Sequence, residues 1–256
     1  MEREQMQQAL SALPGRIGLY YENLATGEAW GHHAEELFES ASVIKLPIFG
    51  AVMKLAAAGE LDLNERLRCR EADKLPSCGA LRYFTDEPEL DLRTLCRLMI
   101  ALSDNTATNL LIRRLGLERL NGEFRAMGLQ ESHLERLLFD SEGAARGLEN
   151  RIVPREMGEL LKQIAQRAFV SEAVSEEMEQ VLRCQQTKHK IPGYLPKSVA
   201  VAHKTGEDSG ITNDVGVVFA PRPFVLCFAS NGTDVPAAER CIRQLALELY
   251  EENAEL

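Results

Sequence analysis

The stretch Phe38–Val52, FESASVIKLPIFGAV, decides the fold because it sets Ser42 and Lys45 into a mostly apolar run. The run continues to Ala58 and ends at Gly59, a residue type that commonly follows the last turn of a helix. A helix that is apolar on every side belongs in the interior of a protein. The sequence therefore predicts a buried helix over residues 42–58, with Ser42 and Lys45 near its start.

Ser42 and Lys45 are three positions apart, so on a helix they share one face, with their Cβ atoms ~5–6 Å apart. Burial lowers the pKa of an amine, and a neutral Lys45 amine is able to take the proton of the Ser42 hydroxyl. The positive end of the helix dipole favours negative charge that develops on Ser42. The alternative interpretation is a capping serine beside a lysine whose stem reaches solvent.

Composition indicates an ordinary globular protein of 256 residues, 45% apolar and 27% charged. The net charge of −10 argues against general nucleic-acid binding, and no uncharged run reaches the ~18 residues of a membrane span. Six cysteines make no CxxC pair and five histidines show no ligand spacing, so we expect neither metal nor cofactor. The expected partner is a small-molecule substrate, and the expected state is a monomer.

The first residues, MEREQMQQAL, lack the basic start and apolar core of a signal peptide. For the chain as written this predicts a cytoplasmic location. A periplasmic or extracellular location is expected if a leader was removed.

The order of predicted elements indicates one antiparallel sheet built from both ends of the chain. Two strands are expected near the N-terminus and three near the C-terminus, rich in β-branched and aromatic residues; the segments are 16–23, 28–33, 198–206, 213–221 and 224–232. Helices are expected over 2–13, 42–58, 91–102, 106–115, 117–127, 154–168, 171–184 and 236–253. We expect a single domain over 1–256, with a sheet lobe of about 1–40 and 190–256 and a helical lobe of about 41–189.

Two short motifs follow Ser42 and Lys45 along the chain. Ser103-Asp104-Asn105 falls between two helical patterns, where a turn that caps the next helix is the simpler interpretation. Lys204-Thr205-Gly206 ends a predicted strand, where a solvated strand end is the simpler interpretation. One prescribed tripeptide is expected only about 0.03 times in a chain of this length, so both in this order are unlikely to arise by chance. S-x-x-K, S-D-N and K-T-G together form the signature of class A β-lactamases and penicillin-binding proteins.

The sequence thus resembles the class A β-lactamase family of penicillin-recognising serine hydrolases, over most of the chain from about residue 17 to the last helix. The resemblance implies an α/β (α+β) fold of the β-lactamase/transpeptidase type. In that fold a five-stranded antiparallel sheet is flanked by helices, and an all-helical lobe is inserted. It also implies a metal-free serine hydrolase that opens β-lactam rings through an acyl-enzyme.

Carried over to this chain, the resemblance implies that Ser42 is the nucleophile and Lys45 its base or proton partner. Ser103 is expected to pass a proton toward the leaving nitrogen, and Asn105 to orient the pocket.

On the predicted strand, Lys204 and Thr205 are expected to bind a substrate carboxylate, and Gly206 to give the substrate backbone clearance. The backbone N–H groups of Glu207 and Ser42 are expected to form an oxyanion hole.

One part of the family pattern does not transfer. The family holds E-x-x-L-N in a loop whose glutamate activates the deacylating water, and residues 135–157 contain no such motif. Counting back from Pro154 places the expected carboxylate near Leu137 or Leu138. The acids available in the loop are Glu135, Asp140, Glu142 and Glu149, of which Glu142 is favoured. The alternative is a charged surface loop without a water-activating carboxylate.

This gap leaves alternatives to a β-lactamase open. A penicillin-binding or sensor-like protein would acylate and then deacylate slowly. A D-Ala-D-Ala peptidase or esterase would use the same residues on another substrate. A disulfide found in some relatives is not expected, because the partner position of Cys96 holds Phe49.

Overall fold

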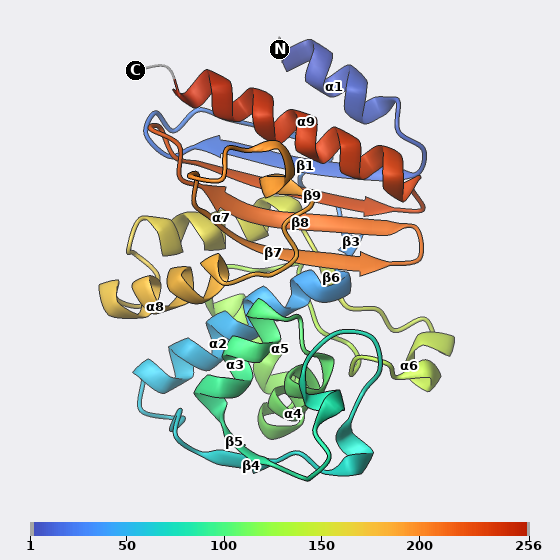
Figure 1. The fold of residues 1–256 in the computed structure, drawn as a ribbon, viewed down its shortest axis with the longest axis vertical. Coiled ribbons are helices and arrows are strands. Elements are labelled where there is room, and N and C mark those ends of the chain that lie inside the picture. Colours follow the sequence, from blue (N-terminus) through green and yellow to red (C-terminus); the bar gives the residue numbers. More distant parts are fainter. Residues whose placement is uncertain (1–2, 255–256) are drawn as a thin grey trace.

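The computed structural model describes residues 3–254, and its centre is a five-stranded antiparallel sheet (Figure 1). The strand order is β2-β1-β9-β8-β7. The bounds are Arg16–Asn23 for β1, Ala29–His32 for β2, Val201–Asp208 for β7, Ile211–Val218 for β8 and Phe224–Asn231 for β9. The predicted fold class, with strands from both ends of the chain, is confirmed. Residues 1–2 and 255–256, the ends of the predicted domain and of its first helix, lie outside the described residues.

The remaining elements surround this sheet. The helices are α1 (Arg3–Ser11), α2 (Lys45–Ala57), α3 (Leu92–Ala101), α4 (Asn105–Leu115), α5 (Leu117–Ala126), α6 (Ser141–Ala145), α7 (Pro154–Ala165), α8 (Glu172–Arg183) and α9 (Val235–Ala254). The 3-10 turns are η1 (Ala41–Ile44), η2 (Glu71–Asp73), η3 (Leu81–Tyr83) and η4 (Ile191–Tyr194). Two short antiparallel pairs join β3 (Phe38–Glu39) to β6 (Arg151–Ile152) and β4 (Arg66–Arg68) to β5 (Glu89–Asp91). These short pairs and α6 were not predicted, because two to five residues carry no periodic pattern.

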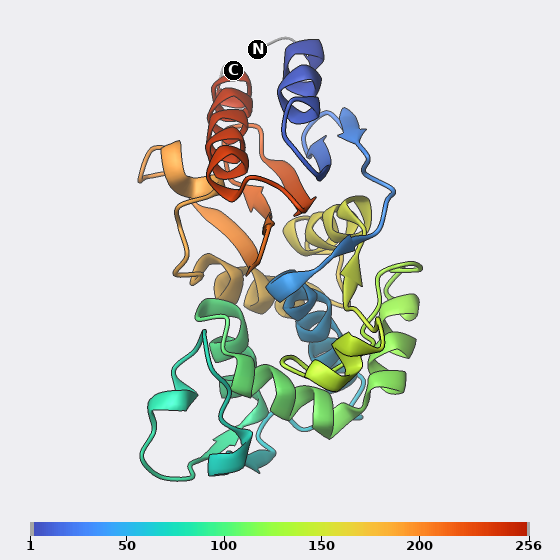
Figure 2. The same ribbon diagram turned by 90° about the vertical axis from the view of Figure 1, so that its right-hand side faces the viewer.

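Helices cover both faces of the sheet. Apolar side chains of α1 and α9 pack on one face in a single cluster with β1, β8 and β9. On the other face α7 contacts β1, β8 and β9, and α8 contacts β7 (Figures 1 and 2). Thus α7 and α8, which fall within the expected helical lobe of 41–189, form a helical layer that packs against the sheet. The lobe below it contains α2 to α5.

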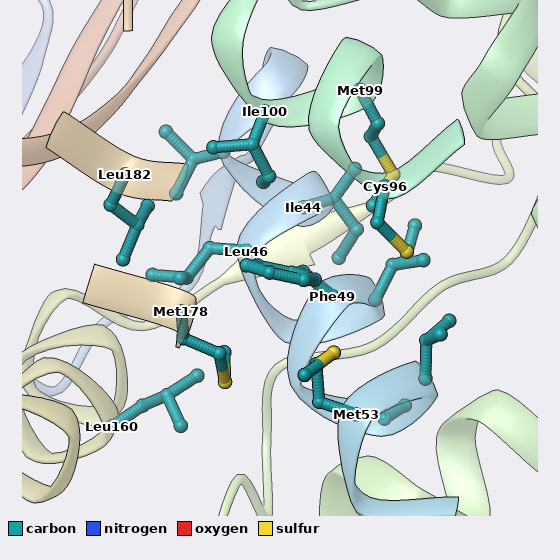
Figure 3. Packing of buried hydrophobic residues seen from close by; sticks show 14 of the residues in the cluster. Ile44, Leu46, Phe49, Met53, Cys96, Met99, Ile100, Leu160, Met178 and Leu182 are labelled. Carbon is teal, nitrogen blue, oxygen red and sulfur yellow. The ribbon is translucent and has the colours of Figure 1, made fainter. Parts of the chain in front are cut away.

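The buried helix α2 passes through the centre of the apolar cluster that lies on the same side of the sheet as α7 and α8. Ile44, Leu46, Phe49 and Met53 are at most 3% exposed, and they pack against side chains of α3, α7 and α8 (Figure 3). Burying each large apolar side chain contributes about 1.5–3 kcal/mol. This packing offsets the cost of burying the polar end of Lys45, and it allows Lys45 to sit at the start of the helix without solvent.

The start of this segment differs from the prediction of a continuous helix over 42–58. Residues Ala41–Ile44 form the 3-10 turn η1, and α2 begins only at Lys45. Residues i and i+3 eclipse each other in a 3-10 turn, so Ser42 and Lys45 still face the same side. Pro47 is accommodated because the first N–H groups of an α-helix have no partner within the helix.

Within residues 3–254, no helix combines the length and the apolar character needed to cross a membrane.

Two helical glycines give a matched test of the packing. A Cβ on Gly158 of α7 would lie 2.3 Å from Cδ1 of buried Tyr20, whereas a Cβ on Gly122 of α5 meets nothing within 4 Å. We expect Gly158→Ala to lower the free energy of unfolding by about 1–3 kcal/mol through overpacking. Gly122→Ala should raise it by about 0.5–1 kcal/mol through helix propensity. Urea unfolding measures both, and a gain in stability from Gly158→Ala would contradict the packing described.

Candidate active site

Ser42 lies on η1 at the edge of the sheet, where the chain passes close to β7. The preceding Ala41 has a φ of +41°, a left-handed backbone conformation that turns the chain into η1. A Cβ on Gly206 would lie 2.9 Å from the Ser40 carbonyl oxygen and 3.1 Å from the Ser42 nitrogen. Only glycine therefore lets β7 approach the serine backbone this closely.

The Lys45 side chain is fully buried and points to four oxygens from two segments of the chain. Its Nζ lies 2.9 Å from Ser42 Oγ, 2.8 Å from the Ser103 carbonyl, 3.0 Å from Ser103 Oγ and 2.7 Å from Asn105 Oδ1. Burial lowers the pKa of Lys45 well below its usual 10.5, and the charge of Lys204 lowers this pKa further. The amine thus loses its proton more readily than a free lysine does, and it lies where it can accept a proton from Ser42.

Ser103 connects two amines. Its Oγ lies 3.0 Å from Lys45 Nζ and accepts a hydrogen bond of 3.1 Å from Lys204 Nζ. Its backbone has a φ of +53°, a conformation that costs a residue other than glycine about 1–3 kcal/mol and that is typical of functional sites. The hydroxyl is therefore placed to move a proton between the base and a group bound above it.

Asp104, the middle residue of the S-D-N motif, holds the turn together. It caps α4 by accepting from the Ala107 N–H at 2.9 Å, and its other oxygen accepts from the N–H groups of Ala80 and Leu81. The Asn105 side chain donates to the Pro76 carbonyl at 3.1 Å while its oxygen faces Lys45. One tripeptide thus fixes both the base and the loop beside the site.

Lys204 on β7 is fully buried beside Ser103, and burial is the main reason that its pKa falls to about 7. Asp214 opposes this shift in pKa, and Lys190 adds to it. Thr205 is buried, and its carbonyl accepts from Lys204 at 2.8 Å.

Lys190 was not identified from the sequence. Its fully buried ammonium donates to the carbonyls of Gly206 and Asn213 at 3.0 and 3.2 Å and lies 3.2 Å from Glu207. In the sequence, only the position of Lys190 directly before the apolar residue Ile191 indicated that its side chain is buried.

A cavity of about 630 Å³ opens over Ser42. Ser42, Asn105 and Glu207 line it, while Lys45, Ser103 and Lys204 lie beneath Ser42 in the buried network. The cavity wall also contains side chains that the sequence did not indicate; these are Glu39, Ser77, Cys78, Arg136, Phe139, Ala144, Asn150 and Ile211.

Counting along the sequence placed the expected carboxylate near Leu137 or Leu138. Of these two residues, Leu138 lines the cavity. Its N–H donates to Asn109 Oδ1, and its carbonyl accepts from Asn109 Nδ2, each at 2.9 Å. This pair of bonds fixes the loop to α4. Asn109 lies one turn after Asn105, a spacing that offered a signal the sequence analysis did not use.

The structure does not bring Glu142 to Ser42. Glu142 lies in the first turn of α6, is exposed and does not line the cavity, because Asp140 begins this helix by accepting from the Gly143 N–H. Asp140 and Glu149 do line the cavity. Glu149, however, is paired with Arg136 through bonds of 2.8 and 3.0 Å.

Fold and site together define a penicillin-recognising serine hydrolase, as the arrangement of the three motifs had predicted. A sequence profile described as the Beta-lactamase enzyme family matches residues 2–253, and the chain belongs to that family.

Individual relatives agree with this assignment. A β-lactamase of Rhodobacter capsulatus is 34% identical over 152 residues, 59% of this chain; the match spans about half (52%) of that relative's length. Among solved structures, a β-lactamase of Sphaerobacter thermophilus is 29% identical with a TM-score of 0.90, covering 100% of this chain and 99% of its own. PBP-A is 31% identical with a TM-score of 0.89, covering 99% and 96%.

The two lysines predict opposite effects of pH on acylation of Ser42 by an anionic ester. Acylation should rise with pH as Lys45 loses its proton. It should fall again above about pH 7, because Lys204 becomes neutral and no longer attracts the carboxylate. Stopped-flow measurement of kcat/KM against pH tests this. A matched ester without the carboxylate should lose the descending limb, and the same limb with both esters would contradict the role of Lys204.

Proposed function

We propose that the protein is a serine hydrolase that opens β-lactam rings through an acyl-enzyme on Ser42. The observation that carries this proposal is the 2.9 Å contact between Ser42 Oγ and the buried, low-pKa amine of Lys45. The hydroxyl is the nucleophile and the amine its base. The substrate is a small molecule, and the protein acts as a monomer.

Each acylation step has a group in the described network. Lys45 accepts the proton as Ser42 Oγ attacks the lactam carbonyl carbon. The backbone N–H groups of Ser42 and Glu207 stabilise the oxyanion. Ser103 donates a proton to the ring nitrogen as the C–N bond breaks, and it is reprotonated through Lys45. These steps leave an ester on Ser42 and a free amine in the opened ring.

The substrate carboxylate belongs beside β7. Lys204 is charged below about pH 7, and Lys190 adds a second positive charge nearby. Thr205 precedes Gly206, whose missing side chain lets β7 approach the backbone of Ser40 and Ser42. The low local dielectric strengthens the attraction between Lys204 and a carboxylate bound here. The bound carboxylate in turn raises the pKa of Lys204 in the complex.

Leu138 favours a second candidate, a penicillin-binding protein that acylates and deacylates slowly. An apolar side chain stands in the cavity wall, Glu142 does not line the cavity, and Glu149 is paired with Arg136. The carboxylates of Asp140 and Asp208 also line the cavity, so the deacylation rate decides between the two candidates. PBP-A, to which this chain is similar, has been solved as a Leu-to-Glu mutant in an acyl-enzyme complex with penicillin G.

Incubation with a chromogenic cephalosporin separates the two candidates. Continuous release of the chromophore supports the β-lactamase. A stoichiometric burst with a stable mass increase supports the slowly deacylating protein. If neither occurs while a short ester is still cleaved, the substrate is a different amide or ester, as in a D-Ala-D-Ala peptidase or esterase.

Ser42→Ala tests the nucleophile. We expect this variant to form no covalent adduct with benzylpenicillin in intact-mass spectra while it keeps the thermal unfolding midpoint of the parent. Ser40→Ala is the matched control, because Ser40 also lines the cavity but donates only to the Ala41 carbonyl, and it should still be labelled. Labelling of Ser42→Ala at the parental rate would remove Ser42 from the mechanism.

Leu138→Glu tests the missing base. A carboxylate at this wall position should speed deacylation at least tenfold, since general-base catalysis contributes 10²–10⁴-fold when it is well placed. Leu138→Gln has the same shape without a base and should deacylate at the parental rate. Acyl-enzyme decay followed by mass spectrometry measures both variants. Equal decay of the Glu and Gln variants would exclude position 138 from deacylation.

A further inference from the structure

Three side chains with metal-binding atoms converge on the side of β7 that faces α9. They are His189 from the loop before η4, Glu207 near the end of β7 and Glu239 in the second turn of α9. His189 Nε2 lies 3.2 Å from Glu239 Oε1 and 3.6 Å from Glu207 Oε1, and all three atoms lie within 4.8 Å of one another. Three distant segments of the chain thus present one imidazole nitrogen and two carboxylate oxygens to a common point.

The two separations from His189 Nε2 suit a tetrahedral ion. Zinc binds histidine nitrogen and carboxylate oxygen at ~2.0–2.2 Å, which places neighbouring tetrahedral ligands roughly 3.3–3.6 Å apart. Both histidine–carboxylate distances are close to this range without any movement of the backbone. Two of the side chains are about half exposed, so water has access to complete the coordination.

The ligands are also held from behind, as metal ligands commonly are. Glu239 is only 18% exposed, and the buried Thr212 hydroxyl lies 3.4 Å from its Oε1. Arg243 donates to the His189 carbonyl at 2.8 Å and fixes the loop. The Lys190 ammonium contacts Glu207, yet it keeps the carbonyls of Gly206 and Asn213 as acceptors when Glu207 turns to an ion.

Other histidine–glutamate pairs in the described part of the chain lack this arrangement. His33 lies 2.6 Å from Glu36, but no second carboxylate joins them. His133 Nε2 lies 4.0 Å from Glu135, with no second carboxylate. Within residues 3–254, only the cluster on β7 and α9 brings three ligand atoms together.

We propose that His189, Glu207 and Glu239 form a binding site for a divalent transition-metal ion of the zinc class, completed by water. The bound ion ties the loop before η4 and the end of β7 to α9. Glu207 also lines the cavity over Ser42, so the ion holds the strand that forms one wall of that cavity. The site stands apart from Ser42 and Lys45, and it does not rest on the proposed β-lactam chemistry.

Zn²⁺ titration of the whole chain by isothermal calorimetry tests this site. We expect one ion per chain and a higher thermal unfolding midpoint at saturating Zn²⁺. His189→Ala and Glu239→Gln should each weaken binding at least tenfold and abolish the rise in the midpoint. The absorption spectrum of the Co²⁺ complex should show tetrahedral coordination.

Two controls make the result decisive. His33→Ala removes an exposed histidine beside a single glutamate and should bind Zn²⁺ as the parent does. Cys78→Ser combined with Cys184→Ser removes the exposed thiols, and binding should persist. Binding that is unchanged in His189→Ala, that vanishes with the thiols, or that is undetectable at millimolar Zn²⁺ would overturn the proposal.

Discussion

The burial of one amine is the constraint on which the rest of the site depends. The Lys45 side chain is fully buried, and its Nζ meets oxygens of Ser42, Ser103 and Asn105. A charged lysine would pay a large desolvation cost there, so the surroundings favour the neutral, basic form. The apolar packing of α2 tolerates that cost, and the left-handed turn at Ser103 supplies the acceptors. The chemistry of the serine therefore follows from the packing of the helix that carries its base.

Much of this arrangement was predictable, because its signals are local. Apolar runs in the sequence indicated α2 and the strands. The S-x-x-K and S-D-N motifs lie at turns, and their own residues determine the backbone conformation there. Asp104, for instance, caps α4 in the way that its position before a helical pattern indicates. The prediction that Ser42 and Lys45 share a face survived even though a 3-10 turn replaced the first helical turn, since both geometries bring i and i+3 together.

Features that depend on distant contacts were not predictable. Counting along the chain left Leu137 and Leu138 as alternatives, and only the paired hydrogen bonds of Asn109 select Leu138. Glu142 was favoured because its loop was read without knowing that Asp140 begins a helix there. Lys190 gave almost no signal, since its acceptors are backbone carbonyls of another segment. Tertiary contacts decide which residues of this kind are buried, and such contacts produce no periodic pattern of apolar residues in the sequence.

The pairing of β1 with β9 has a consequence for biosynthesis. Arg16 pairs with Asn231 and Asn23 with Phe224, so the first strand finds its central neighbour only after some two hundred further residues have been made. Ser42 and Lys45 leave the ribosome early, but the strand that carries Lys204 and the strand that completes the sheet leave late. Contacts of such long sequence separation form slowly. A nascent or truncated chain therefore lacks the strand that carries Lys204, and the complete site forms only when synthesis is nearly finished.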